Sequence, residues 1–450
     1  MNKPRSHWTN RWTFILATAG SAIGLGNIWK FPYMTGVNGG SAFVLVFLVC
    51  IAVVGIPLMM CEIMLGRRAQ RNPIDGMQQL AHEAGRSSAW KWVGIMGLFA
   101  GLLILTFYSV IAGWILHYIV EAARGLFKGV DGTVAAARFS AFLASPIELL
   151  FWHTLFIIMT MSVVARGVNA GLEQANKILM PSLFAILLVL LGYSMSVGDF
   201  HRAAQFMFTP DFSKVTPAAV LSALGHAFFS LSLGMGTVMV YGSYLQRHVS
   251  IARTTFYIAI ADTMVGLLVG LAIFALVFAN GLEPAAGPGL IFQTLPIAFG
   301  RMPGGTIMGV LFFILVAFAA WTSAISLVEP AVAWITENTS LNRHQAALMI
   351  ALFDWLLGIA VLLSFNVWQD VHLLFGLGIF DTLDKLTTNI MLPLGGLSMA
   401  IFAGWRMKTL HVKDELVISN RAYANWRFTI RYITPLAIIA IFLYLFGLIR

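Results

Sequence analysis

Two short stretches place glycines and exposed backbone in the middle of long apolar segments. The first, from Ala22 to Gly26, reads Ala-Ile-Gly-Leu-Gly, and the second, from Ser232 to Gly236, reads Ser-Leu-Gly-Met-Gly. Glycine weakens a helix interior, and a broken helix exposes N–H groups that attract anions and carbonyl oxygens that attract small cations. Two such breaks beside one cavity could therefore hold a zwitterion and a sodium ion together.

Other polar side chains lie deep in the apolar segments, where ionisable groups are costly and are therefore functional candidates. Asp262 has no cation in its own sequence neighbourhood, which favours a bound metal ion or a proton as its partner. The alternative is a neutral Asp that forms a hydrogen bond with another helix. The remaining ionisable candidates are Lys30, Glu62, Glu329, Asp354, Asp381, Asp384 and Lys385.

Hydroxyl groups offer a second set of oxygen ligands. Thr322 and Ser323 follow Ala319 on one helix face, and oxygen ligands suit sodium better than zinc or copper. Alternatively, Ser and Thr in a span bond only to their own backbone. His226 precedes the second break by one turn, and we expect it to be a hydrogen-bonding neighbour of the site and not a metal ligand.

A membrane-embedded helical bundle must position these residues. Of the 450 residues, 59% are hydrophobic and 10% are charged, a composition that no water-soluble domain needs. About 20 apolar residues cross a bilayer, so we predict one all-α transmembrane domain over 1–450 with about eleven spans. The predicted spans are 12–36, 41–66, 89–124, 148–166, 171–196, 217–245, 254–280, 305–336, 344–365, 371–405 and 428–449.

The two breaks fall in the first and sixth predicted spans. The two breaks are five spans apart, an odd number, so the chain enters the membrane from opposite sides at the first and the sixth span. This is the arrangement of the inverted repeats of secondary transporters. We predict a 5+5 inverted repeat with discontinuous helices 1 and 6: repeat one at about 12–196, repeat two at about 217–405 and an extra helix at about 428–449. The alternative, that the glycines only allow close helix packing, does not explain why the breaks match.

The net charge of +9 is mainly a topology signal, because cytoplasmic loops carry the excess of Lys and Arg. Placing the N-terminus in the cytoplasm puts most of these residues, Arg343 included, on the cytoplasmic side. No basic domain is present to bind nucleic acid. Cys50 and Cys61 form no metal-binding spacing and imply no disulfide framework.

The motifs GSAIGLGNIWKFPY, NGGSAF, GIPLM and FFSLSLGMG, together with residues 319–323, resemble those of the neurotransmitter:sodium symporter family, whose fold is that of the bacterial leucine transporter. The resemblance extends from Arg5 and Trp8 to the last span. It implies a sodium-coupled symporter of neutral, hydrophobic L-amino acids that works by alternating access and is not an enzyme. The alternatives are a non-transporting amino-acid sensor of the same fold and an ion channel.

The resemblance also implies one substrate pocket and two sodium sites. Sodium site 1 comprises Ala22, Asn27, Ser230 and Asp262, and sodium site 2 comprises Gly20, Ile23, Ala319, Thr322 and Ser323. The substrate pocket comprises Ser21, Ala22, Gly24, Leu25, Gly26, Ile104, Tyr108, Phe229, Ser230, Ser232, Met235, Ser323, Ser326 and Leu327. Within it, Tyr108 and the first break would bind the substrate carboxylate, and carbonyls of the second break would bind its ammonium group.

Three substitutions relative to the family refine this expectation. Relatives that need chloride have Asn at the position of Asp262 and Tyr at that of Phe47, which implies chloride-independent transport here. Amine transporters have Asp at the position of Gly24, so its absence favours an amino-acid substrate.

The resemblance implies gates on both sides of the pocket. Lys30 with Asp384 would form the outer gate, and Arg5 with Glu337 the inner one, with Trp8 and Tyr244 packed nearby. Gly171 and Pro181 match the point where the family's fifth span unwinds, and Glu62 would bond backbone groups freed at the breaks. The short termini suggest a multi-pass protein of a prokaryotic inner membrane. The preferred amino acid, the number of sodium ions, proton countertransport and the oligomeric state stay open.

Overall fold

The computed structural model describes residues 7–284, 289–374, 376–445 and 447–448, and it confirms the predicted all-α membrane architecture. Within these residues every regular element is helical. Nine helical stretches in them are long and apolar enough to cross a membrane. The first and sixth predicted spans are present as broken helices, whose pieces are individually too short to span. The sequence estimate of about eleven spans therefore agrees with nine continuous and two broken ones.

The helices form continuous spans, broken spans and connections. The continuous spans consist of α3 (Ser41–Cys50), α4 (Ile56–Ala69), α6 (Lys91–Ala123), α8 (Pro146–Ala165), α9 (Gln174–Val197), α13 (Ile251–Ala279), α15 (Gly305–Asn338), α16 (Arg343–Leu363), α17 (Ile379–Lys385), α18 (Leu392–Ile401), α20 (Asn420–Phe428) and α21 (Thr434–Leu445). The broken spans consist of α1 (Arg11–Ala22), α2 (Phe31–Val37), α11 (Pro217–Ser230) and α12 (Thr237–Ser243). The connections contain α5 (Pro73–Glu83), α7 (Gly132–Leu143), α10 (Phe200–Phe208), α14 (Leu295–Arg301) and α19 (Thr409–Leu416).

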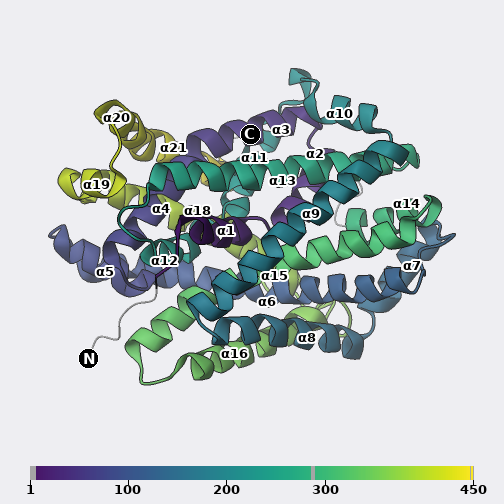
Figure 1. The fold of residues 1–450 in the computed structure, drawn as a ribbon, viewed down its shortest axis with the longest axis horizontal. Helices are drawn as coiled ribbons and strands as arrows, with labels where there is room; N and C mark the ends of the chain where they lie inside the picture. The colour runs from purple at the N-terminus through teal and green to yellow at the C-terminus, as the bar shows by residue number, and fades with distance from the viewer. Residues whose placement is uncertain (1–6, 285–288, 375, 446, 449–450) are drawn as a thin grey trace.

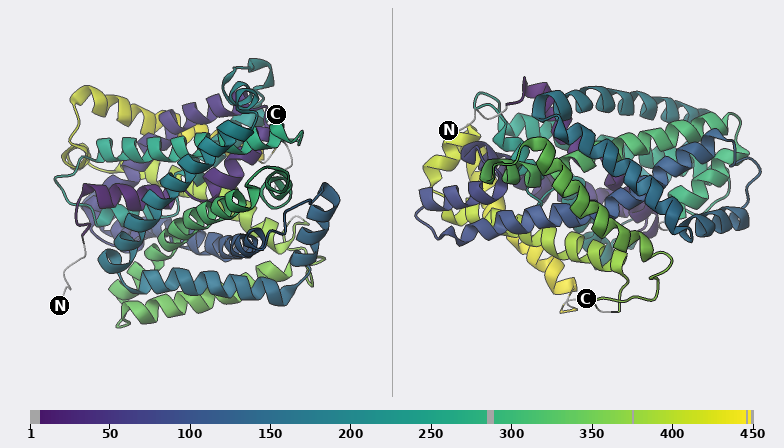
Figure 2. Two further views of the ribbon diagram at one scale, coloured as in Figure 1. Left: turned by 45° about the vertical axis from the view of Figure 1, so that its right-hand side comes forward. Right: turned by 90° about the horizontal axis from the view of Figure 1, so that it is seen from below.

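The broken helices lie inside a bundle of long ones. In Figure 1, α1 lies in the middle of the molecule, between α13 and α15, both of which it contacts. The C-terminal helices, yellow in Figures 1 and 2, lie at the periphery. Within Asn420–Leu445, only 22% of the 18-residue apolar segment that could cross a membrane is buried inside the protein. The site residues therefore lie in the interior, and the last span has a mainly external position.

Both helix breaks lie at the predicted glycine-containing stretches. The first lies between α1, which ends at Ala22, and a wide π-helical turn that begins at Gly26. The second contains Ser232, Gly234 and Gly236 with φ of 54°, 82° and 76°. A Cβ on Gly234 would lie 2.2 Å from the carbonyl oxygen of Leu392. Glycine is therefore required there for both conformation and space.

Prolines determine where several spans widen. Five π-helical segments, η1 (Gly26–Lys30), η2 (Ile51–Gly55), η6 (Leu290–Thr294), η7 (Leu386–Met391) and η9 (Thr429–Ile433), each lead directly into a helix with proline as its second residue. Proline lacks an N–H, and its ring clashes with the carbonyl one turn earlier. A wider turn separates these groups without ending the helix.

Several helix boundaries differ from the sequence prediction. The tenth span begins at Ile379 and not at 371, because Gly376 has a φ of 72° and Gly378 is extended at the helix start. The last helical stretch begins at Asn420 and not at 428, since Ser419 caps α20. The fifth span begins at Val168 with a π-helical segment, η4 (Val168–Glu173). The predicted unwinding point there is helical in this conformation.

Candidate substrate and ion site

The two breaks enclose a small cavity in the interior of the bundle. Its lining comprises Ser21, Ala22, Gly24, Leu25, Gly26, Ile104, Tyr108, Phe229, Ser232, Met235, Ser323 and Leu327. All of them belong to the set predicted from the sequence, whose other two members are Ser230 and Ser326. The open volume is about 20 Å³, little more than a water molecule occupies. A larger ligand therefore requires the walls to move apart.

One end of the cavity is polar and the other is apolar. At the polar end the Tyr108 hydroxyl accepts a hydrogen bond from the Leu25 N–H at 3.2 Å. Ser21 donates to the hydroxyl of Ser326 at 2.8 Å, and Ser232 donates to the Ser21 carbonyl at 2.9 Å. The apolar end is formed by three side chains, Ile104, Met235 and Leu327. The cavity thus offers hydrogen-bonding groups for a polar head and dry walls for an apolar side chain.

The predicted members of sodium site 1 lie together beside this cavity. Asp262 is fully buried and accepts hydrogen bonds from the Asn27 amide at 2.8 Å and from the Ser230 hydroxyl at 2.7 Å. The side-chain oxygen of Asn27 accepts from the Gly24 N–H at 3.4 Å. Ala22, whose carbonyl was the fourth predicted ligand, is buried at the end of α1. Oxygen atoms from α11, α13 and the first break are therefore concentrated at one point.

The predicted members of sodium site 2 also lie together. The Ser323 hydroxyl is 3.2 Å from the carbonyl oxygen of Gly20 and 3.4 Å from that of Ile23. Thr322 donates to the Ala319 carbonyl at 3.1 Å. Each of these residues is buried. A donor set made only of oxygen atoms suits a hard cation, and the described residues contain no cluster of His, Cys, Asp and Glu suited to another metal.

Glu62 supports the second break from α4. Its carboxylate is fully buried, and one of its oxygens accepts a hydrogen bond from the Gly234 N–H at 2.7 Å. This N–H is one of the backbone groups released by the interruption of the helix, and a buried unpaired donor would be costly. The contact agrees with the supporting role expected from the sequence.

Lys30 and Asp384, the residues predicted to form the outer gate, form an ion pair beside one wall of the cavity. Their charged atoms are 3.8 Å apart, and the side chains are 28% and 33% exposed. The Lys30 ammonium group also lies 4.8 Å from the centre of the Phe229 ring, which lines the cavity. The ion pair and the aromatic wall of the cavity are thus connected through one lysine.

We expect Lys30→Ala to speed the release of bound substrate while changing the apparent melting temperature little. A partly exposed ion pair at this distance contributes only about 0–1 kcal/mol to stability, whereas its loss uncovers Phe229. The dissociation rate of a labelled substrate tests the first expectation, and thermal unfolding of the purified protein tests the second. Lys128→Ala, at an exposed lysine outside the cavity, is the control. Equal release rates for the two variants would contradict a gating role.

The N-terminal segment packs against α12 and the residue that follows it. Trp8 is only 1% exposed, donates its indole N–H to the Tyr241 carbonyl at 3.1 Å, and bonds through its backbone N–H to the Tyr244 carbonyl. Arg5, the predicted partner of Glu337, lies outside the described residues. Glu337 itself accepts hydrogen bonds from the backbone and side chain of Asn72, at 3.0 and 2.8 Å.

An ion pair that the sequence did not predict lies next to Tyr244. Arg343, which the sequence identified only as a loop cation, forms a salt bridge with the fully buried Glu329. The Tyr244 hydroxyl donates to the same carboxylate at 2.8 Å. Glu329 is the residue from which this pair could have been predicted, because a buried acid in α15 needs a cation. Arg343, the first residue of the next helix, is close enough along the chain to supply it.

The expectation that His226 forms hydrogen bonds beside the site was wrong. Within the described residues, neither of its ring nitrogens has a hydrogen-bond partner, although the side chain is buried. The imidazole packs instead against Phe31, Phe43 and Phe47, with ring centres 5.2 to 6.3 Å away. Aromatic residues from α2 and α3 fill the space that a polar partner would occupy.

The chain is similar to known sodium-dependent transporters. A profile described as the sodium:neurotransmitter symporter family matches residues 5–126 and 144–449. The chain is 39% identical to YhdH, an uncharacterized sodium-dependent transporter of Bacillus subtilis, and 34% identical to one of Haemophilus influenzae, with 98% of both chains covered in each case. It also matches a crystal structure of MhsT in complex with L-phenylalanine. The TM-score is 0.91 at 42% identity, covering 98% of this chain and 99% of MhsT.

These matches extend over nearly the full length of the chain, and the family consists of membrane transporters and not of enzymes. The broken helices, the buried oxygen clusters and the predicted gate residues are thus found in a chain that belongs to the sodium:neurotransmitter symporter family.

Proposed function

We propose that this protein uses a sodium gradient to take up neutral, hydrophobic L-amino acids, without a requirement for chloride. The observation that carries the proposal is the two-ended cavity between the helix breaks. Its polar end offers N–H and hydroxyl groups for an amino-acid head, and Ile104, Met235 and Leu327 form the other end. A charged side chain there would be desolvated without a partner, so a neutral, hydrophobic one fits best. The complex of MhsT with L-phenylalanine supports an amino-acid substrate.

In this proposal two sodium ions bind at the two oxygen clusters. Ala22, Asn27, Ser230 and Asp262 hold the first together with the substrate carboxylate. The second is held by the set predicted from the sequence, namely Gly20, Ile23, Ala319, Thr322 and Ser323. The buried Asp262 carboxylate supplies next to the first ion the fixed negative charge for which relatives use chloride.

In this proposal the protein works by alternating access. Sodium and substrate stabilise the conformation in which both gates are closed. The gates open one at a time, and the bound sodium and substrate thereby cross the membrane. Lys30 and Asp384 form the outer gate, and Trp8, Tyr244 and Glu337, with Arg5, form the inner one. We place the protein in a prokaryotic inner membrane as one domain, with a cytoplasmic N-terminus and repeats at about 12–196 and 217–405 followed by the extra helix at about 428–449.

Uptake into liposomes tests the proposal. The reconstituted protein is given labelled Leu, Met, Phe, Tyr and Trp, with and without an inward sodium gradient, in chloride and in gluconate. We expect uphill, sodium-dependent accumulation of at least one of them in both anions. Binding without accumulation would identify a sensor, and downhill ion flux without substrate movement would identify a channel. Accumulation only in chloride would overturn the role given to Asp262.

A further inference from the structure

A basic pocket lies on the surface where the beginnings of α1 and α13 meet. It has a volume of about 460 Å³ and is lined by residues 9–12, Ile15, Gln246, 248–250, Arg253, Thr254 and Tyr257. Arg11, His248 and Arg253 are all exposed. Among the described residues, no Asp or Glu lines the pocket. The pocket therefore presents two guanidinium groups and an imidazole with no acid to neutralise them.

Neither arginine forms an ion pair with a described acid. The Arg11 guanidinium lies 5.0 Å from the centre of the Trp12 ring, a contact that does not use its N–H groups as hydrogen-bond donors to a carboxylate or carbonyl and so leaves them available to an oxyanion. Arg253 lies in the first turn of α13, and Arg11 is the first residue of α1. Two helix beginnings add partial positive charge at the same place. The pocket suits a phosphate group.

The surroundings of the pocket indicate that this phosphate belongs to a lipid. Trp12 and Tyr257 stack at its rim with ring centres 6.2 Å apart, and exposed Trp and Tyr are typical of the membrane–water interface. Next along α13, Phe256, Ile260 and Met264 are 53%, 44% and 46% exposed. Their spacing of four places them on one helix face. Exposed apolar side chains in a transmembrane helix face acyl chains, and this stripe begins directly beside Arg253.

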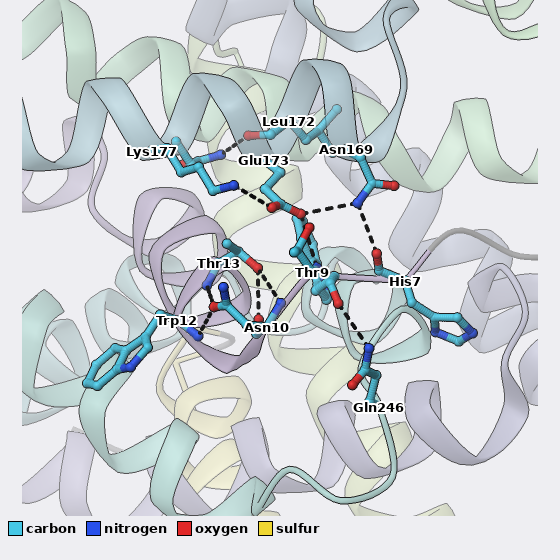
Figure 3. Close-up of polar contacts among 12 residues, drawn as sticks. His7, Thr9, Asn10, Trp12, Thr13, Asn169, Leu172, Glu173, Lys177 and Gln246 are labelled. Atoms are coloured by element: carbon cyan, nitrogen blue, oxygen red, sulfur yellow. Dashed lines mark hydrogen bonds and ion pairs between the residues drawn. The ribbon is translucent and has the colours of Figure 1, made fainter.

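Hydrogen bonds and an ion pair connect Thr9 and Gln246 of the pocket lining to neighbouring residues, as Figure 3 shows. Glu173 accepts hydrogen bonds from the Thr9 backbone N–H and the Asn169 amide, both at 3.2 Å, and pairs with Lys177 at 2.7 Å. Gln246 donates to the Trp8 carbonyl at 3.3 Å. These contacts fix the chain that leads into α1 and with it the position of Arg11. A preorganised site loses less entropy when it binds.

We propose that this basic pocket binds the phosphate headgroup of an anionic phospholipid, with the acyl chains along the exposed stripe of α13. The headgroup joins the beginning of α1 to that of α13. The bound lipid thereby stabilises the conformation in which the N-terminal segment closes the transporter. The basic pocket shares no lining residue with the central cavity, so lipid binding there does not depend on which substrate the central cavity holds.

Thermal unfolding of the purified full-length protein in a neutral detergent tests this site. The probes are dioctanoylphosphatidylglycerol, dioctanoylphosphatidylcholine and inorganic phosphate. We expect the anionic lipid to raise the apparent melting temperature at roughly tenfold lower concentration than the zwitterionic lipid, because nearby basic residues favour anionic headgroups. Equal potency of the two lipids would overturn the proposal. A full shift with inorganic phosphate alone would show that a free anion occupies the pocket and would overturn the lipid assignment.

Variants assign the effect to the pocket. The double variant R11Q/R253Q should lose the preference for the anionic lipid, and each single variant should lose part of it, which keeps the test valid if the double variant does not fold. The matched control is R71Q/R86Q, which removes the same charge from two exposed arginines outside the pocket. A loss of preference in the control equal to that in R11Q/R253Q would overturn the proposal. Native mass spectrometry, which counts bound lipids, should give the same ranking.

Discussion

Asp262→Asn should weaken the apparent sodium affinity of uptake by about tenfold or more, in chloride and in gluconate alike. The substitution keeps the shape of the side chain but removes the one fixed negative charge in contact with Asn27 and Ser230. In a buried site, a charged ligand binds a cation far more strongly than a neutral amide does. Chloride should not restore uptake, because Phe47 has no hydroxyl to bind it. Sodium titrations of substrate uptake in liposomes measure the effect.

Asp354→Asn is the matched control for this substitution. Asp354 is also fully buried in a membrane span, but its carboxylate contacts Ser109 at 3.3 Å and no predicted sodium ligand. We expect its sodium dependence to equal that of the wild type. If Asp262→Asn behaved like Asp354→Asn, or if chloride restored its uptake, the carboxylate would have no role in sodium binding.

Gly24→Ala should weaken substrate binding by about tenfold or more. A Cβ at this position would lie 2.5 Å from the Ser323 hydroxyl and 2.8 Å from that of Tyr108. Ser323 could move away only by losing its contacts with the carbonyls of Gly20 and Ser21, and overpacking of this kind costs about 1–3 kcal/mol. The methyl group would also occupy the polar end of a cavity with little open volume. Equilibrium binding of a labelled amino acid measures the loss.

Gly225→Ala provides the control for the added methyl group. Gly225 lies in α11, close to the second break, and nothing lies within 4 Å of a Cβ built there. The substitution also favours a helix, since alanine has a higher helix propensity than glycine. We expect normal binding and equal or higher thermal stability. Normal binding by Gly24→Ala as well would contradict the position assigned to the substrate head.

The sequence alone determined the class of the protein and the position of its breaks. Apolar runs of spanning length require helices in a membrane. The repeated pattern of small, apolar and glycine residues correctly predicted interruptions at Ala22–Gly26 and Ser232–Gly236, next to the observed ends of α1 at Ala22 and of α11 at Ser230. The prolines that follow the π-helical segments were also visible in the sequence. Each of these features depends on residues close together in the chain, so local physical chemistry is sufficient to predict it.

The family resemblance identified site residues that the structure then brought together. Composition and spacing alone could not join Ser323 to Gly20, because the two residues are more than 300 positions apart. Some helix ends also could not be predicted from the sequence. The start of the tenth span at Ile379 depends on the conformation of Gly376 and Gly378, which an apolar run does not reveal.

Only the tertiary structure decided which helix faces meet. It paired Arg343 with Glu329, surrounded His226 with phenylalanines, and formed the basic pocket from the beginnings of α1 and α13. In water-soluble proteins the apolar face of a helix indicates the core. In a membrane the side that faces lipid is as apolar as the side that faces protein. The periodicity therefore contains too little information to orient the helices, and their packing determines the site.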